Sequence, residues 1–88
     1  MGSSTPVALN AWASDYGKVV VEGSDGVQYH ADLTGLSAVY CYPKDEAAWQ
    51  KVCVDSYGLA LVWTTRFEVH MDQVVGLAFK KEPVAQTA

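Results

Sequence analysis

The side chains best suited to binding a metal are few, and they are widely separated along the chain. Cys41 and Cys53 lie twelve residues apart, and His30 and His70 lie forty apart. A structural zinc site usually shows two close pairs such as Cys-x2-Cys, so this spacing predicts no metal ligands and no cofactor. We interpret both cysteines as small core residues with reduced thiols, and a disulfide between them is the alternative.

Neither histidine has the neighbours that a general base requires. Such a base needs a nucleophile and an orienting partner within hydrogen-bond reach. Asp32 shares a strand face with His30, but side chains two residues apart on a strand are separated by about 7 Å. Glu68 stands in the same relation to His70. We therefore predict a protein that is not an enzyme and has no catalytic residues, with a small hydrolase or transferase as the least favoured alternative.

Two carboxylates and one glycine-rich segment have structural explanations. Asp32 and Asp55 each precede a turn, where a carboxylate can accept hydrogen bonds from nearby backbone N–H groups. Residues 23–26, Gly-Ser-Asp-Gly, join two strands, whereas a phosphate-binding loop leads into a helix. The sequence predicts turns at all three places.

The aromatic residues are the feature that indicates an interaction. Three Trp, five Tyr and two Phe are too many to bury completely in one domain of 88 residues. Trp, Tyr and Arg often dominate the energetics of protein interfaces. An equally weighted alternative is that the aromatic residues of this chain only form its core and the layer between core and surface. Because two of the tyrosines are separated by a single residue, Cys41, at least one of them is expected to face solvent or a partner. The candidate partner-binding residues are Tyr40, Tyr42, Trp49, Tyr57, Trp63 and Arg66.

Alternating apolar and polar residues predict the strands that position these side chains. A first strand is expected over residues 5–14, with Val7, Leu9 and Ala11 on one face. The β-branched run at 18–22 and the alternating run at 27–32, joined by Asp-Gly, predict a hairpin. A second hairpin is predicted from a central strand at 59–63, a polar turn and a strand at 67–70.

The segments between the strands indicate short helices. Residues 33–42 fit a helical turn or an irregular, buried connection, and Pro43 ends any helix there. A short helix is expected over 45–51, and Asp72 is the expected N-cap of another that carries Val74, Val75 and Leu77. The predicted fold class is α+β, a small antiparallel sheet of hairpins with one or two short helices packed on it.

The length and the charge of the chain limit its domain organisation and the kinds of partner it can bind. One domain is expected over residues 6–79, with a disordered N-terminus or an expression-tag remnant at 1–5 and a disordered tail at 80–88. Six Lys and Arg against ten Asp and Glu give a net charge of −4, and the cations do not cluster, which argues against nucleic-acid binding. No stretch is long and apolar enough for a bilayer, and the N-terminus lacks the pattern of a signal peptide. We expect a cytoplasmic protein that does not bind membranes.

Three sequence segments resemble a small bacterial family known as domain of unknown function twenty-four forty-two. They are the Asp-Gly turn leading to Asp-Leu-Thr-Gly-Leu (25–36), the segment Trp-Gln-Lys-Val-Cys-Val-Asp (49–55), and Gly-Leu-Ala-Leu-Val-Trp (58–63). With residues 67–77, the resemblance covers roughly residues 7–78. The family often has Asn-Gly in its last hairpin, where this chain has Thr65 and Arg66.

The resemblance implies a compact sheet with a short helix packed on it. It also implies an accessory module, sometimes fused to a helix-turn-helix segment, which we do not find here, or encoded beside a small toxin, and it supplies no catalytic residues. We therefore predict a protein-interaction module that binds a protein partner or itself through a sheet edge or an aromatic patch, in an antitoxin-like or inhibitor-like role. A small-molecule or metal-sensing domain, in which His30, His70, Cys41 and Cys53 converge, is the second hypothesis.

Overall fold

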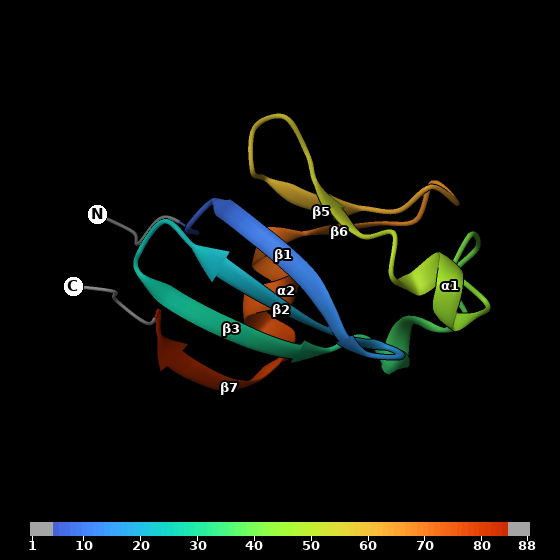
Figure 1. Cartoon of the computed structure of the whole chain (residues 1–88), viewed down its shortest axis with the longest axis horizontal. Helices are drawn as coiled ribbons and strands as arrows, with labels where there is room; N and C mark the ends of the chain where they lie inside the picture. The colour runs from blue at the N-terminus through green and yellow to red at the C-terminus, as the bar shows by residue number, and fades with distance from the viewer. Residues whose placement is uncertain (1–4, 85–88) are drawn as a thin grey trace.

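Four antiparallel strands form the larger of two sheets in the computed structural model, which describes residues 5–84 (Figure 1). Their order across the sheet is β1-β2-β3-β7, so the first three strands are consecutive and the last returns to pair with β3. The strands are β1 (Ala8–Asp15), β2 (Lys18–Gly23), β3 (Val27–Asp32) and β7 (Ala78–Pro83).

The smaller sheet has three antiparallel strands. Its central strand is β5, in agreement with the central strand predicted at 59–63. They are β4 (Cys53–Val54), β5 (Ala60–Val62) and β6 (Glu68–His70). The helical elements of the described residues are short: a 3-10 turn η1 (Thr34–Leu36), α1 (Glu46–Trp49) and α2 (Met71–Leu77). The predicted hairpins are confirmed, but the domain is β-rich, with two sheets where one was expected.

The hairpin of β2 and β3 forms as predicted, as an antiparallel pair. Val19 pairs with Ala31 and Val21 pairs with Tyr29, and these four side chains are buried. Gly26 has a φ of +79° in the connecting turn, a conformation that glycine adopts without steric cost. Local alternation and turn chemistry agree here, which is why the sequence predicted this hairpin correctly.

The first strand begins later than predicted, and its inward face differs. Leu9 was expected to share a face with Ala11, yet it is 67% exposed, while Ala8 and Ala11 pack against the core. The register shifts between Ala8 and Asn10, so Leu9 is an extra residue on the bulged strand. A β-bulge interrupts the period of two, and simple alternation therefore assigned Leu9 to the wrong face.

The tail predicted to be disordered is ordered over residues 80–83, which belong to β7. His30 pairs with Lys80 and Gln28 pairs with Glu82 across the β3–β7 ladder. The Nε2 of His30 lies 2.9 Å from Oε1 of Glu82, and Nζ of Lys80 lies 3.4 Å from Oε2 of Glu82. The prediction failed because β7 is a polar edge strand that is recognisable only by its pairing with β3. The expectations for residues 1–4 and 85–88 lie outside the described residues.

The N-cap predicted for the second helix, Asp72, is two residues too late. The structure places His70 at the N-cap, and its backbone N–H donates to Oε1 of Gln73 at 3.3 Å. The helix starts earlier because Met71, at its first position, is buried together with Val74. For the first helix, predicted over 45–51, Asp45 is the N-cap and its Oδ1 accepts a hydrogen bond from the N–H of Ala48 at 2.8 Å.

An aromatic cluster of Tyr42, Trp49, Trp63 and Phe67 forms part of the core that joins the two sheets. Ring centroids of Trp49 and Trp63 are 4.8 Å apart, and those of Tyr42 and Phe67 are 5.1 Å apart. Both indoles are also hydrogen-bonded: Nε1 of Trp49 donates to the carbonyl of Lys18 at 3.0 Å, and Nε1 of Trp63 donates to the carbonyl of Trp49 at 2.9 Å. The cluster therefore ties β2, α1 and the smaller sheet together.

Candidate functional site

Half of the predicted partner-binding residues belong to the core. Tyr42, Trp49 and Trp63 lie in the aromatic cluster, with exposed fractions of 5%, 0% and 4%. The prediction that they contact a partner directly is wrong, because the smaller sheet and α1 close over them. A sequence shows that a residue is aromatic, but which elements cover it depends on the tertiary fold.

The other three predicted residues are exposed and stand on different segments. Tyr40 is 91% exposed in the loop before α1, and Tyr57 is 79% exposed in the turn between β4 and β5. Figure 1 shows these two segments well apart. Tyr40 is exposed and Tyr42 is buried, which confirms that at least one of the two tyrosines faces outward; Cys41, between them, has a φ of +73°.

Arg66 is exposed in the tight turn between β5 and β6. The N–H of Arg66 donates to the carbonyl of Trp63 at 3.0 Å, and the N–H of Trp63 donates to the carbonyl of Phe67 at 2.9 Å. The φ of Arg66 is +73°, so an ordinary side chain occupies a left-handed position where the resembled family often has Gly. The turn closes despite this substitution.

Arg66→Gly is expected to stabilise the protein. A left-handed conformation costs a side chain about 1–2 kcal/mol, whereas glycine adds about 0.4–1 kcal/mol of unfolded-state entropy, so the free energy of unfolding should rise by about 0.5–1 kcal/mol. Urea denaturation followed by circular dichroism measures the change. Thr64→Gly, in the same turn, is the control and should not stabilise; equal effects of both variants would contradict the explanation.

Three exposed apolar residues lie on the two segments that meet where β1 approaches the β4–β5 turn. The N–H of Ala8 donates to the carbonyl of Gly58 at 2.6 Å, which brings Leu9 to the same junction as Tyr57 and Leu59. These last three side chains are 67%, 79% and 54% exposed. We call Leu9, Tyr57 and Leu59 the junction patch. Its two leucines could not be recognised from the sequence, because simple alternation places Leu9 on the core face and Leu59 begins the predicted central strand.

Asp55 holds the turn that presents two members of this patch. Its Oδ1 accepts hydrogen bonds from the N–H groups of Tyr57 and Leu59 at 3.1 and 2.9 Å. Asp32 does the same for Thr34, accepting from its N–H at 2.9 Å and its hydroxyl at 2.6 Å. The hydrogen bonds from the Thr34 hydroxyl and N–H hold the pKa of Asp32 below its usual value. The prediction that both carboxylates cap turns is confirmed.

The cysteines and histidines do not form a common site. Cys53 is exposed, which overturns its interpretation as a core residue, and Cys41 is half-buried; both thiols are free. His30 contacts Gln28 and Glu82 on the outer face of the large sheet, and His70 lies 3.6 Å from Glu68. Over residues 5–84, no three His, Cys, Asp or Glu side chains gather closely enough to hold a metal ion.

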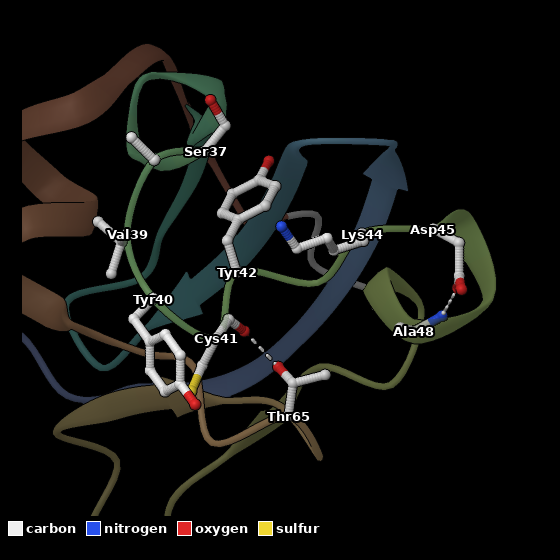
Figure 2. Close-up of a pocket in the computed structure, with 10 residues that line it drawn as sticks. Ser37, Val39, Tyr40, Cys41, Tyr42, Lys44, Asp45, Ala48 and Thr65 are labelled. Atoms are coloured by element: carbon white, nitrogen blue, oxygen red, sulfur yellow. Dashed lines mark hydrogen bonds between the residues drawn. The ribbon is translucent and has the colours of Figure 1, made fainter.

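An open cavity of about 660 Å³ lies between the loop at 37–45, α1 and the β5–β6 turn (Figure 2). The loop that forms most of its wall follows η1, so the connection predicted over 33–42 is helical only at its start and is mostly exposed. A second cavity of about 240 Å³ adjoins it. Both are lined by Ser37, Tyr42 and Lys44.

Among residues 5–84, no helix is long and apolar enough to cross a membrane. Comparison of the chain with models of protein families, with curated proteins and with solved structures found no match. The resemblance to the family of unknown function stays a prediction, and the case for a function rests on the junction patch and the cavity.

Proposed function

We propose that the protein is a non-enzymatic interaction module that binds a protein partner, or a second copy of itself, through the junction patch. The observation that carries this proposal is the exposure of Leu9, Tyr57 and Leu59 at one junction of the fold. Large apolar side chains that gather on a surface are typical of interaction sites, whereas isolated ones are common on any protein. The patch includes one of the aromatic residues that the sequence singled out, Tyr57.

The edge of the large sheet at β7 is a poorer docking site. This strand carries Lys80, Lys81 and Pro83. Lysine and proline on an edge strand disfavour pairing with another chain, because a buried ammonium is costly and proline has no N–H to donate. The junction patch is therefore better supported than this sheet edge, which the sequence also suggested as a docking site.

The charge of the chain suits a basic partner. Its net charge is −4, and acidic residues outnumber basic ones ten to six. Long-range attraction would speed association with a cationic protein and would weaken as salt increases. An antitoxin-like or inhibitor-like role in the cytoplasm is the concrete form of this proposal that the resembled family suggests.

Leu9→Lys combined with Leu59→Lys tests the patch. Charging two central contacts of an interface is expected to weaken association at least thirtyfold, since hot-spot residues contribute about 2 kcal/mol or more. Sedimentation velocity over a wide concentration range measures self-association, and affinity capture from native lysate compares the proteins retained by each form. Partners retained by the wild type should be identified and rebound in purified form.

Leu77→Lys is the matched control, because Leu77 is a 40% exposed leucine on α2. It should leave association unchanged. A wild-type protein that stays monomeric and captures no binding partner would overturn the proposal, and so would a double variant that associates as well as the wild type.

The cavity beside Tyr42 favours the second hypothesis, a small-molecule sensing domain. Its volume falls within the range of about 300–1,000 Å³ that is usual for ligand pockets. The two functions are compatible, because the cavity and the junction patch share no residue.

A further inference from the structure

The large sheet has an outer face, directed away from the core, that no other element of residues 5–84 covers. On its inner face, Val19, Val21 and Ala31 of the two central strands cluster with Val74 of α2. In Figure 1 this helix lies behind β2 and β3, and no helix or strand from outside the sheet lies in front of them. The side chains that alternate with the inward residues therefore form an open surface.

A row of aromatic and apolar side chains crosses the outer face. The register places Trp12 opposite Val20, and Val20 opposite His30. An extra residue in β7, Phe79, continues the row: its ring centroid lies 6.4 Å from that of His30 and 5.8 Å from Nζ of Lys18. Trp12 is 38% and Phe79 61% exposed, whereas Val20 is 3% exposed. Because adjacent strands lie about 4.8 Å apart, the row spans roughly 14 Å and has no gap at Val20.

A second row, of planar polar side chains, runs parallel to the first. The register pairs Asn10 with Glu22, Glu22 with Gln28, and Gln28 with Glu82, one residue from each strand. Nε2 of Gln28 donates to Oε2 of Glu22 at 3.5 Å. Nε2 of His30 lies 3.2 Å from Oε1 of Gln28 and 2.9 Å from Oε1 of Glu82. These contacts order the row before any ligand arrives, which reduces the entropy lost on binding.

The polar row offers both donors and acceptors of hydrogen bonds. The amides of Asn10 and Gln28 have N–H groups and a carbonyl oxygen, and Glu22 and Glu82 have carboxylate oxygens. Lys80, with Nζ 3.4 Å from Oε2 of Glu82, holds the pKa of Glu82 below its usual value, so this carboxylate is ionised at neutral pH. Hydroxyl groups both donate and accept, so a ligand rich in neutral hydroxyls suits such a row.

From this arrangement we infer that the outer face of the large sheet binds a neutral oligosaccharide. Sugar rings have apolar C–H faces and hydroxyl edges. The C–H faces stack on the rings of Trp12 and Phe79, and the hydroxyls form hydrogen bonds with the row that runs from Asn10 to Glu82. Because Trp12 and Phe79 belong to the two edge strands, one sugar ring is too short to contact both, and the site requires a chain of several rings.

The charge of the outer face distinguishes this ligand from a nucleic acid. Single-stranded nucleic acids also stack their bases on the aromatic side chains of a sheet. Their phosphates would meet the carboxylates of Glu22 and Glu82 on a chain whose net charge is −4, whereas a neutral sugar experiences no such repulsion. The outer face shares no residue with the junction patch, so the inference does not depend on the proposed interaction function.

Cellopentaose, maltopentaose and chitopentaose are suitable probes, each compared with its own monosaccharide. Binding is followed by the backbone amide chemical shifts of the uniformly ¹⁵N-labelled protein and by the indole N–H resonance of Trp12. At least one pentasaccharide should shift resonances of β1, β2, β3 and β7. Its monosaccharide should bind at least about tenfold more weakly, because it contacts only one of the two aromatic residues. An oligothymidylate of similar length should shift none of these resonances.

Substitutions in each row test the two kinds of contact. Trp12→Ala and Phe79→Ala should each weaken binding of that pentasaccharide about tenfold, and Asn10→Ala about fivefold. Tyr57→Ala and Gln50→Ala are the matched controls, because they remove an exposed ring and an exposed amide that lie outside the large sheet. Both controls should leave the affinity unchanged.

Urea denaturation separates lost binding from lost folding. Phe79→Ala changes a mostly exposed residue of an edge strand, so its unfolding midpoint should stay close to that of the wild type. Four results would overturn the inference: no shifts with any of the three pentasaccharides, equal binding of pentasaccharide and monosaccharide, unchanged affinity in Trp12→Ala or Phe79→Ala, or tighter binding of the oligothymidylate to this face. None of them bears on the junction patch, which is tested by association with a protein.

Discussion

Trp49→Ala is expected to lower the free energy of unfolding by about 3–5 kcal/mol, the usual cost of removing a buried tryptophan. Trp49 is fully buried at the centre of the aromatic cluster, 4.8 Å from the ring of Trp63. The substitution also removes the hydrogen bond from its Nε1 to the carbonyl of Lys18. A domain of 88 residues typically has a stability of about 4–13 kcal/mol, so the variant should lose much of its margin and become partly unfolded at moderate temperature.

Urea denaturation monitored by far-ultraviolet circular dichroism measures this loss without relying on tryptophan fluorescence. Tyr40→Ala is the matched control, because Tyr40 is an aromatic residue that is 91% exposed. It should change the free energy of unfolding by no more than about 0.5 kcal/mol. If the two variants lost similar stability, the assignment of Trp49 to the core would be wrong.

Gly58→Ala has the second largest expected effect. Gly58 has a φ of +71°, and a Cβ at this position would lie 2.6 Å from the carbonyl oxygen of Ala8. The left-handed conformation costs about 1–2 kcal/mol, and the collision with β1 backbone adds to it, so we expect a total loss of about 3–4 kcal/mol. The same change should separate β1 from the β4–β5 turn and disturb the junction patch.

Gly26→Ala isolates the contribution of the close approach. Gly26 has a φ of +79°, but a Cβ there would meet no atom within 4 Å. This variant should therefore show only the conformational cost of about 1–2 kcal/mol. Equal losses for the two glycines, in urea denaturation under identical conditions, would show that β1 and the turn do not approach each other as described.

The junction patch and the cavity differ in how the fold creates them. The patch depends on a hydrogen bond between two segments about fifty residues apart in the chain, Ala8 and Gly58. The cavity depends mainly on one continuous loop, which begins after η1 and ends at α1, with Thr65 added from the β5–β6 turn. A variant that loosens the junction should therefore impair partner binding while leaving the cavity unchanged.

Local pattern was enough to predict the parts of the fold in which neighbouring residues decide the structure. The alternation at 27–32, the β-branched run at 18–22 and the Asp-Gly turn between them gave a hairpin with the observed inward face. The turn-capping roles of Asp32 and Asp55 were also predicted, because a carboxylate accepts hydrogen bonds from N–H groups only a few residues away.

Two features of the fold, strand β7 and the bulge in β1, depend on pairing between strands, and the local sequence pattern could not predict them. The polar residues 80–83 have no apolar periodicity, and they form β7 only because β3 offers an unpaired edge. The extra residue in β1 is likewise invisible in composition, since a bulge is defined by the partner strand. It changes the position of Leu9 from the core to the surface.

The hypotheses about the roles of single residues differ most from what the tertiary structure shows. Two histidines and two cysteines raised the question of a metal or catalytic site, and over residues 5–84 the tertiary structure gathers no three possible metal ligands in one place. The excess of aromatic residues correctly indicated that some face outward. Which ones do so depends on how the smaller sheet, α1 and the loop at 37–45 close over the core, because burial is a property of the elements that surround a side chain. The sequence determined the two hairpins, the capped turns at Asp32 and Asp55 and the net acidic charge, whereas only the tertiary structure added β7 to the large sheet, brought Leu9 beside the turn of Tyr57 and enclosed the hydroxyl of Tyr42.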